Sequence, residues 1–180
     1  MMKQKIVLLH QYYLPHRHGT LSYELATEFA KHYQISVITG KSQDITNESV
    51  NTHSNNDLSV KRLAYKAHSK ETQLGRIRNY FSFFYATWKN RALFKEADVV
   101  IVFSTPPIIP LIPALLSRKY GFNLIFVVHD LYPDIAVKLN YTSENSIGTW
   151  IFKTLNTFLY KRCATIVVLS KDMQELFLRT

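Results

Sequence analysis

The stretch Leu124–Asp134 reads LIFVVHDLYPD, so five apolar residues run without interruption into a histidine and an aspartate. Four further runs have the same form, a short apolar segment rich in β-branched residues that ends in small or polar residues. Such segments are typical of strands that are covered on both faces of a parallel sheet. The four are Ile6–Leu9 before His10, Ile35–Thr39 before Gly40, Val99–Phe103 before Ser104, and Ile166–Leu169 before Ser170.

Longer helix-like segments separate the apolar runs, and a further strand is expected at Val60–Ala64. This alternation predicts an α/β fold, a Rossmann-like open and mostly parallel sheet with helices on both faces. In open sheets of this kind the ligand crevice lies outside the carboxyl ends of the strands. The polar endings of the runs are therefore expected to converge on one edge and to form a site.

The composition is that of a globular protein, with 180 residues of which 47% are hydrophobic and 19% charged, enough for one core-forming domain. The amino terminus lacks the apolar stretch of a signal peptide, which predicts a cytoplasmic location. Ile108–Leu116 is apolar but falls well short of the roughly 20 residues that span a bilayer. Cys163 is the only cysteine, so it excludes an internal disulfide and a cysteine-based zinc cluster, and we expect it to be a packing residue.

The formal charge of +9 indicates an anionic partner, because the fold alone does not require it. Nucleic acid, an anionic membrane surface and phosphorylated ligands are the candidates. The sequence contains no zinc-finger spacing, no aromatic RNP-like strand and no uniform basic tail, so we predict no nucleic-acid partner.

The segment Gln73–Glu96, taken as a helix, has two stripes of side chains instead of one. The first is mostly apolar and is expected to pack on the sheet: Leu74, Ile77, Phe81, Phe84, Tyr85, Trp88 and Ala92. The second mixes arginine with aromatic residues, which predicts contact with an anionic membrane surface or with a second layer of protein. Its members are Arg76, Tyr80, Phe83, Thr87, Arg91 and Phe94.

The loop from His10 to Thr20 is the first candidate for chemistry, because Gly19 and Thr20 directly precede a predicted helix at Leu21–His32. A glycine at such a turn lets the backbone approach an anion, and the helix N-terminus offers unpaired N–H groups to phosphate. The alternative is that Gly19 only forms the turn. Neither G-x-G-x-x-G nor a P-loop is present.

The second candidate follows the run that ends at Val128. There His129, Asp130 and Asp134 could hydrogen-bond sugar hydroxyls or orient an attacking group, or the aspartates could cap the next helix. A third candidate is the pair Ser104 and Thr105, whose hydroxyls either face the same crevice or merely end a strand before a helix.

Four stretches in this order resemble the amino-terminal domain of family-4-like retaining glycosyltransferases, most closely the bacterial surface-polysaccharide branch. They are Lys5–Tyr13 with Pro15 and Gly19, Asp98–Pro107, Val127–Val137 and Cys163–Lys171. The resemblance implies one half of a GT-B architecture, in which this half binds the acceptor and a second Rossmann-like domain binds the nucleotide-sugar donor. It further implies a lipid-linked saccharide acceptor, no metal cofactor, and a place on the inner face of the plasma membrane.

The resemblance also implies roles for individual residues. His129 and Asp130 are the expected catalytic pair, and Gly19 and Thr20 would lie against the donor phosphates. His18-Gly19 stands where the family usually has two glycines, which leaves less room for the phosphates. The expected acceptor or sugar contacts are Tyr13, His18, Ser104, Thr105 and Asp134.

The family continues into a donor domain beyond the helix in which Thr180 lies, so we expect little sugar transfer from these residues alone. The alternative is a Rossmann-like module without catalysis, which docks on a membrane or on a partner glycosyltransferase subunit. A third hypothesis, an NAD-type oxidoreductase, is disfavoured by the missing glycine fingerprint.

Overall fold

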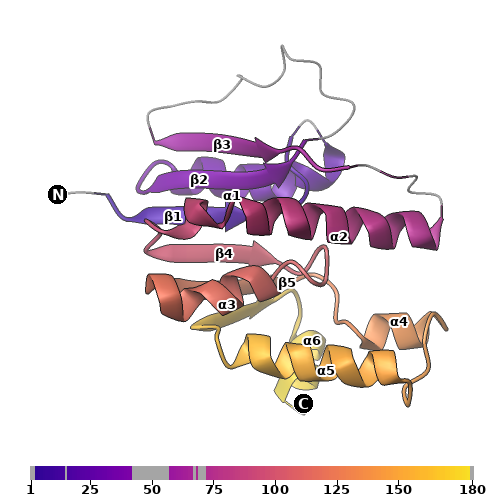
Figure 1. Ribbon diagram of the computed structural model, residues 1–180. Helices are drawn as coiled ribbons and strands as arrows, with labels where there is room; N and C mark the ends of the chain where they lie inside the picture. Colours follow the sequence, from indigo (N-terminus) through magenta and orange to yellow (C-terminus); the bar gives the residue numbers. More distant parts are fainter. Residues whose placement is uncertain (1–2, 15, 42–56, 67, 69–71, 179–180) are drawn as a thin grey trace.

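The structure is a computed structural model that describes residues 3–14, 16–41, 57–66, 68 and 72–178, and it forms one sheet covered by helices (Figure 1). The strands are β1 (Lys5–Leu9), β2 (Gln34–Gly40), β3 (Leu58–Leu63), β4 (Val99–Phe103), β5 (Asn123–Val128) and β6 (Thr165–Val168). The helices are α1 (Thr20–Phe29), α2 (Gln73–Lys89), α3 (Leu111–Tyr120), α4 (Asp134–Lys138), α5 (Ile147–Tyr160) and α6 (Lys171–Leu178), with 3₁₀ turns η1 (Arg17–Gly19) and η3 (Arg91–Phe94).

The six strands are all parallel and lie in the order β3-β2-β1-β4-β5-β6. The chain builds the sheet outward from β1 in one direction and then, from β4, in the other. The order therefore reverses between β1 and β4, which makes that gap the topological switch point of the sheet. The expected Rossmann-like α/β fold is confirmed.

Each face of the sheet has its own core. Helices α2, α3 and α5 cover one face. There Phe83, Ile112 and Leu159 pack on every second residue of the strands. Helix α1 covers the other face through Ala26. The strand β6 is the exception to the expected double burial, because it is an edge strand whose side chains alternate between exposed and half-buried.

Helix α2 packs with the face opposite to the one that the sequence predicts. The buried residues include Phe83, and Phe94 in the following 3₁₀ turn, both expected on a membrane or partner face. The stripe expected in the core is largely solvent-exposed, with Phe81 61% and Tyr85 68% accessible. Of the predicted partner face, Arg76 and Arg91 are exposed and Tyr80 is half-buried.

Polar residues on the buried side of α2 explain this error. The amide of Asn79 is buried and bonds the backbone of His68 twice, accepting from its N–H at 2.7 Å and donating to its carbonyl at 3.0 Å. The buried hydroxyl of Thr87 donates to the Phe83 carbonyl one turn earlier. Because these polar groups are satisfied locally, the helix can bury them, and apolar periodicity alone identifies the wrong face.

No helix in the described part of the chain is both long enough and apolar enough to cross a membrane.

Candidate functional site

The carboxyl ends of β1, β4 and β5 bring His10, Phe103 and His129 into one cluster at the switch point. The His10 ring lies 4.6 Å from the Phe103 ring, which lies 5.2 Å from the His129 ring, measured between centroids. The two imidazoles are 6.3 Å apart, edge to face. The parallel topology thus unites residues that are 119 positions apart in the sequence, as the expected convergence of strand endings requires.

The hydroxyl of Ser104 fixes the turn that carries the predicted catalytic pair. It accepts hydrogen bonds from the backbone N–H of His129 at 2.9 Å and of Asp130 at 3.2 Å. Ser104 itself is buried, whereas Thr105 beside it is half-buried. Ser104 therefore holds the backbone of His129 and Asp130 in place. Its burial does not support its predicted role as a sugar contact.

His129 is half-buried, and its Nε2 atom is buried without a hydrogen-bond partner among the described residues. Burial lowers the pKa of this imidazole, and the nearby Asp130 carboxylate opposes that shift. The ring is therefore neutral at pH 7, with one nitrogen that donates and one that accepts. A ligand hydroxyl can bond Nε2 only when a neighbouring side chain moves, because the atom itself has no accessible surface.

His10 braces the loop that follows β1. The Ser22 hydroxyl donates towards the carbonyls of Gly19 and Tyr12, at 2.9 and 3.1 Å, so its oxygen must accept from His10 Nδ1 at 3.1 Å. This assignment makes His10 the neutral tautomer with the hydrogen on Nδ1. Burial, followed by the neighbouring His129, lowers the pKa of His10 to about 3.

The low pKa of His10 predicts acid sensitivity. In the unfolded chain a histidine takes up a proton near pH 6.5, whereas folded His10 resists protonation down to about pH 3, so its contribution to stability is lost as the pH falls through that window. Between pH 7 and pH 5 we expect this residue to cost about 2 kcal/mol of unfolding free energy. His10→Asn, which keeps a donor near Nδ1, should flatten the decline by that amount in urea titrations at the two pH values. An unchanged decline would contradict the assignment.

Gly19 is buried and serves close packing. A Cβ atom added there would overlap the backbone of Tyr13, and the Gly19 N–H donates to the His16 carbonyl at 2.7 Å. These contacts support the turn role of this glycine. Thr20 is exposed as the first residue of α1, and contact of either residue with donor phosphates stays a prediction.

Tyr13 and His18, both predicted to contact acceptor or sugar, lie in different surroundings. Tyr13 is 3% exposed and packs in the core between Tyr23 and the Arg62 guanidinium, so burial removes it from any surface contact. His18 is exposed in η1, with its ring 5.2 Å from that of His16.

The structure adds three residues to the site that sequence reasoning missed or misplaced. The N-terminal half of α2 reaches past the carboxyl ends of the strands (Figure 1), and it carries Arg76 and Tyr80. Burial raises the pKa of Tyr80 and of Tyr132, while Arg76 lowers both and Asp130 raises both, so the four groups lie within electrostatic reach. Only the length and direction of α2 relative to the sheet reveal this grouping.

Asp134 is exposed as the first residue of α4, where the N-cap position belongs to Pro133, so the capping alternative is not supported for its side chain. It lines a pocket of about 800 Å³ next to the site, between α4, α5 and α6. Lys138, Lys153 and Tyr160 line the same pocket. Its walls therefore carry negative charge from Asp134 and positive charge from the two lysines.

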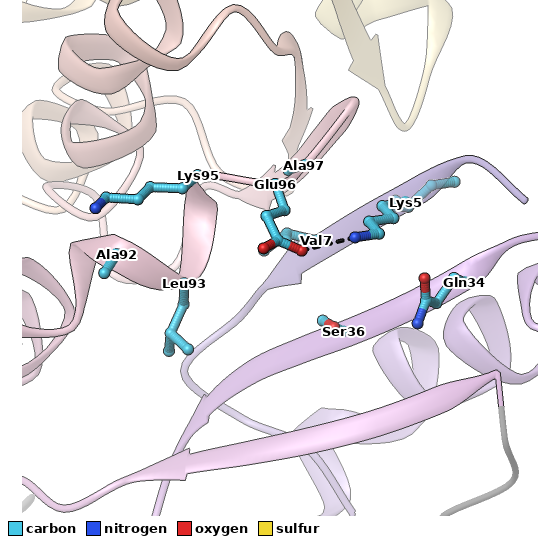
Figure 2. A pocket seen from close by; sticks show the side chains of 10 residues that line it. Lys5, Val7, Gln34, Ser36, Ala92, Leu93, Lys95, Glu96 and Ala97 are labelled. Atoms are coloured by element: carbon cyan, nitrogen blue, oxygen red, sulfur yellow. Dashed lines mark hydrogen bonds and ion pairs between the residues drawn. The ribbon is translucent and has the colours of Figure 1, made fainter. Parts of the chain in front are cut away.

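A second pocket, of about 330 Å³, lies at the opposite edge of the sheet, by the amino ends of β1 and β2 (Figure 2). An ion pair of 2.6 Å between Lys5 Nζ and Glu96 Oε2 crosses it. It contains no histidine and is remote from the strand endings. Among the described residues, no three His, Cys, Asp or Glu side chains are grouped so that they could hold a metal ion.

These observations define the class of protein, a Rossmann-like α/β domain with a polar site at the switch point of its sheet. The chain belongs to glycosyltransferase family 4, whose family model matches residues 18–180. It is the amino-terminal, Rossmann-like half of a GT-B architecture.

The chain is also similar to individual proteins. It is 28% identical over 82 residues to a probable glycosyltransferase, WbjE, of Pseudomonas aeruginosa, a match of 46% of this chain and 20% of that protein. Sucrose-phosphate synthase of Thermosynechococcus elongatus has the same fold, with a TM-score of 0.67 and 14% identity over 98% of this chain and 45% of that one. UGT2 of Phytolacca americana, solved with UDP-2-fluoro-glucose and pterostilbene, matches with a TM-score of 0.51 and 12% identity. This match covers 93% of the present chain and 47% of UGT2. The chain thus spans a fifth of the curated relative and less than half of these solved chains.

Proposed function

We propose that this chain is the acceptor-binding half of a retaining glycosyltransferase. The enzyme would move a sugar from a nucleotide sugar to a lipid-linked saccharide in the synthesis of a cell-surface polysaccharide. The observation that carries the proposal is the unpartnered His129 Nε2 atom at the switch point of a family 4 domain. A buried ring nitrogen without a partner is costly, and a ligand hydroxyl would satisfy it once the surrounding side chains move to admit the ligand.

The surroundings of His129 suit a saccharide. Its neutral imidazole provides one donor and one acceptor for sugar hydroxyls, and the Asp130 carboxylate provides acceptors. Half-buried Tyr80 and Tyr132 offer aromatic surface. Arg76 adds a fixed positive charge at the same edge. The donor diphosphate would lie at the N-terminus of α1, by Thr20, where the helix dipole favours anions.

A transfer assay tests this proposal. The chain is combined with a donor-binding domain of the same family, and radiolabelled nucleotide sugars are offered with lipid-linked saccharides. We expect His129→Ala to lower label in the lipid fraction about a hundredfold or more, because it removes a contact to the transferred sugar. The matched control is His32→Ala, an exposed histidine after α1, which should transfer as the unaltered chain does. Equal transfer by His129→Ala would overturn the proposal.

The second candidate is a docking module without a catalytic cycle, and the exposed apolar side of α2 favours it. The same substitution separates the two functions. In a docking module, His129→Ala leaves assembly and polysaccharide output unchanged, whereas in the enzyme it abolishes output.

A further inference from the structure

Three of the helices on one face of the sheet, α2, α3 and α5, contain basic residues and no acidic ones. The short α6, which packs on the same core through Met173 and Phe177, adds Asp172 and Glu175. Helix α2 has three, namely Arg76, Arg78 and Lys89, whereas α3 has two and α5 has one. Helix α1, on the other face, has the reverse pattern, with Glu24 and Glu28 and neither lysine nor arginine. Six of the chain's 22 basic residues thus lie on these three helices, with no acidic residue in any of the three.

The same three helices expose large apolar side chains. On α2 they form a stripe with helical spacing, opposite the side buried against the sheet, and between 37% and 68% of each is accessible. Helices α3 and α5 contribute more, so the outer surface of this layer is apolar and basic together. We call it the acid-free face, and its exposed apolar residues are Leu74, Ile77, Phe81, Tyr85, Trp88, Leu115, Ile147, Trp150 and Ile151.

One cation lies beside an exposed ring of this face and another beside the half-buried Tyr120 ring. The Arg91 guanidinium lies 5.5 Å from the centre of the Trp88 ring, and Lys119 Nζ lies 5.8 Å from that of Tyr120. Lys153 has an acid near it, with Glu144 Oε1 at 3.9 Å. The other basic residues of the three helices have no ion pair with the described part of the chain, so their charge is available to an outside partner.

We propose that the acid-free face binds the surface of an anionic lipid bilayer. Phe81, Trp88 and Trp150 would enter the boundary between headgroups and acyl chains, while Arg78 and Lys89 meet the lipid phosphates. Charge complementarity favours this occupant over a second copy of the chain. A two-fold contact would place the same unpaired cations opposite one another, which is unfavourable.

The orientation that follows would serve the proposed function, although the docking does not depend on it. The acid-free face runs parallel to the sheet, and α2 begins beyond the carboxyl ends of the strands (Figure 1). A chain docked by this face holds Arg76, Tyr80 and His129 beside the membrane, with the site opening along its surface. A saccharide on a lipid anchor could then reach the site without leaving the bilayer.

Vesicle co-sedimentation tests the docking, with the full chain and vesicles of phosphatidylcholine alone or mixed with phosphatidylglycerol. We expect binding to the mixed vesicles only, and weaker binding at high salt. Phe81→Ala and Arg78→Glu should each weaken it about tenfold. Leu21→Ala and Lys31→Glu are the matched controls, because both residues are exposed in or just after α1 on the other side, and they should bind unchanged.

Two results would overturn the docking proposal. One is absence of binding to the anionic vesicles. The other is a dimer in sedimentation equilibrium that Phe81→Ala converts to monomer, which would assign the face to a second copy. The vesicle assay involves no sugar transfer, so its failure leaves the glycosyltransferase proposal standing, and a failed transfer assay leaves the docking standing.

Discussion

Phe83→Ala is expected to lower the free energy of unfolding by about 3–5 kcal/mol. The ring is fully buried between α2 and the sheet, with the Tyr65 ring 5.6 Å away, centre to centre. Removing it leaves a cavity that the surrounding strands cannot close, and the lost burial adds to the cost of that cavity. Urea denaturation followed by circular dichroism measures the change.

Phe81→Ala is the matched variant, two residues away on the same helix. Its ring is 61% exposed, so we expect a change within about 0.5 kcal/mol. The pair decides which side of α2 packs on the sheet, because the side that apolar spacing favours would give the opposite ranking. A larger loss for Phe81→Ala than for Phe83→Ala would contradict the packing described here.

Gly19→Ala should be nearly as damaging. The added methyl group would overlap the backbone of Tyr13, and a backbone cannot rotate away as a flexible side chain does. We expect a loss of about 3 kcal/mol, which lowers Tm by about 6–12 °C for a chain of this size. Thermal unfolding followed by circular dichroism gives the value.

Gly148→Ala controls for the loss of a glycine as such. Near this residue, in the first turn of α5, the closest atom to an added Cβ is Ser146 Oγ at 3.8 Å, an ordinary contact. Alanine also favours the helix, so we expect the free energy of unfolding to stay the same or to rise by up to about 1 kcal/mol, and Tm to stay or rise with it. If the Tm of Gly19→Ala equals that of Gly148→Ala, the backbone of the turn is not packed as tightly around Gly19 as the structure shows.

The sheet could be predicted because its signal is local. Uninterrupted apolar runs such as Val99–Phe103 are typical of strands covered on both faces, and their polar endings meet because parallel strands share an edge. His129 could be named on the same ground. The helix α2 shows the limit of such reasoning, since buried Asn79 depends on His68, a partner that lies on another segment of the chain.

The remaining site residues depend on tertiary geometry. Arg76 and Tyr80 reach the site only because α2 overhangs the strand ends, and no spacing within the helix reports that. Gly19 is similar, since its packing against Tyr13 follows from the fold of the loop. Ser104 illustrates the converse: its position after a strand was informative, but its hydroxyl is occupied by the two backbone amides that it holds.

The edge strand β6 affects how the chain behaves in concentrated solution. It pairs with β5 on one side only. Val167 within it is 42% exposed, and Leu169 directly after it is 60% exposed. An edge with exposed apolar side chains is a template on which another polypeptide can add a strand. Intermolecular sheet growth would therefore begin at this edge, and a charged residue in place of Val167 would oppose such growth without disturbing the strand ends that form the site.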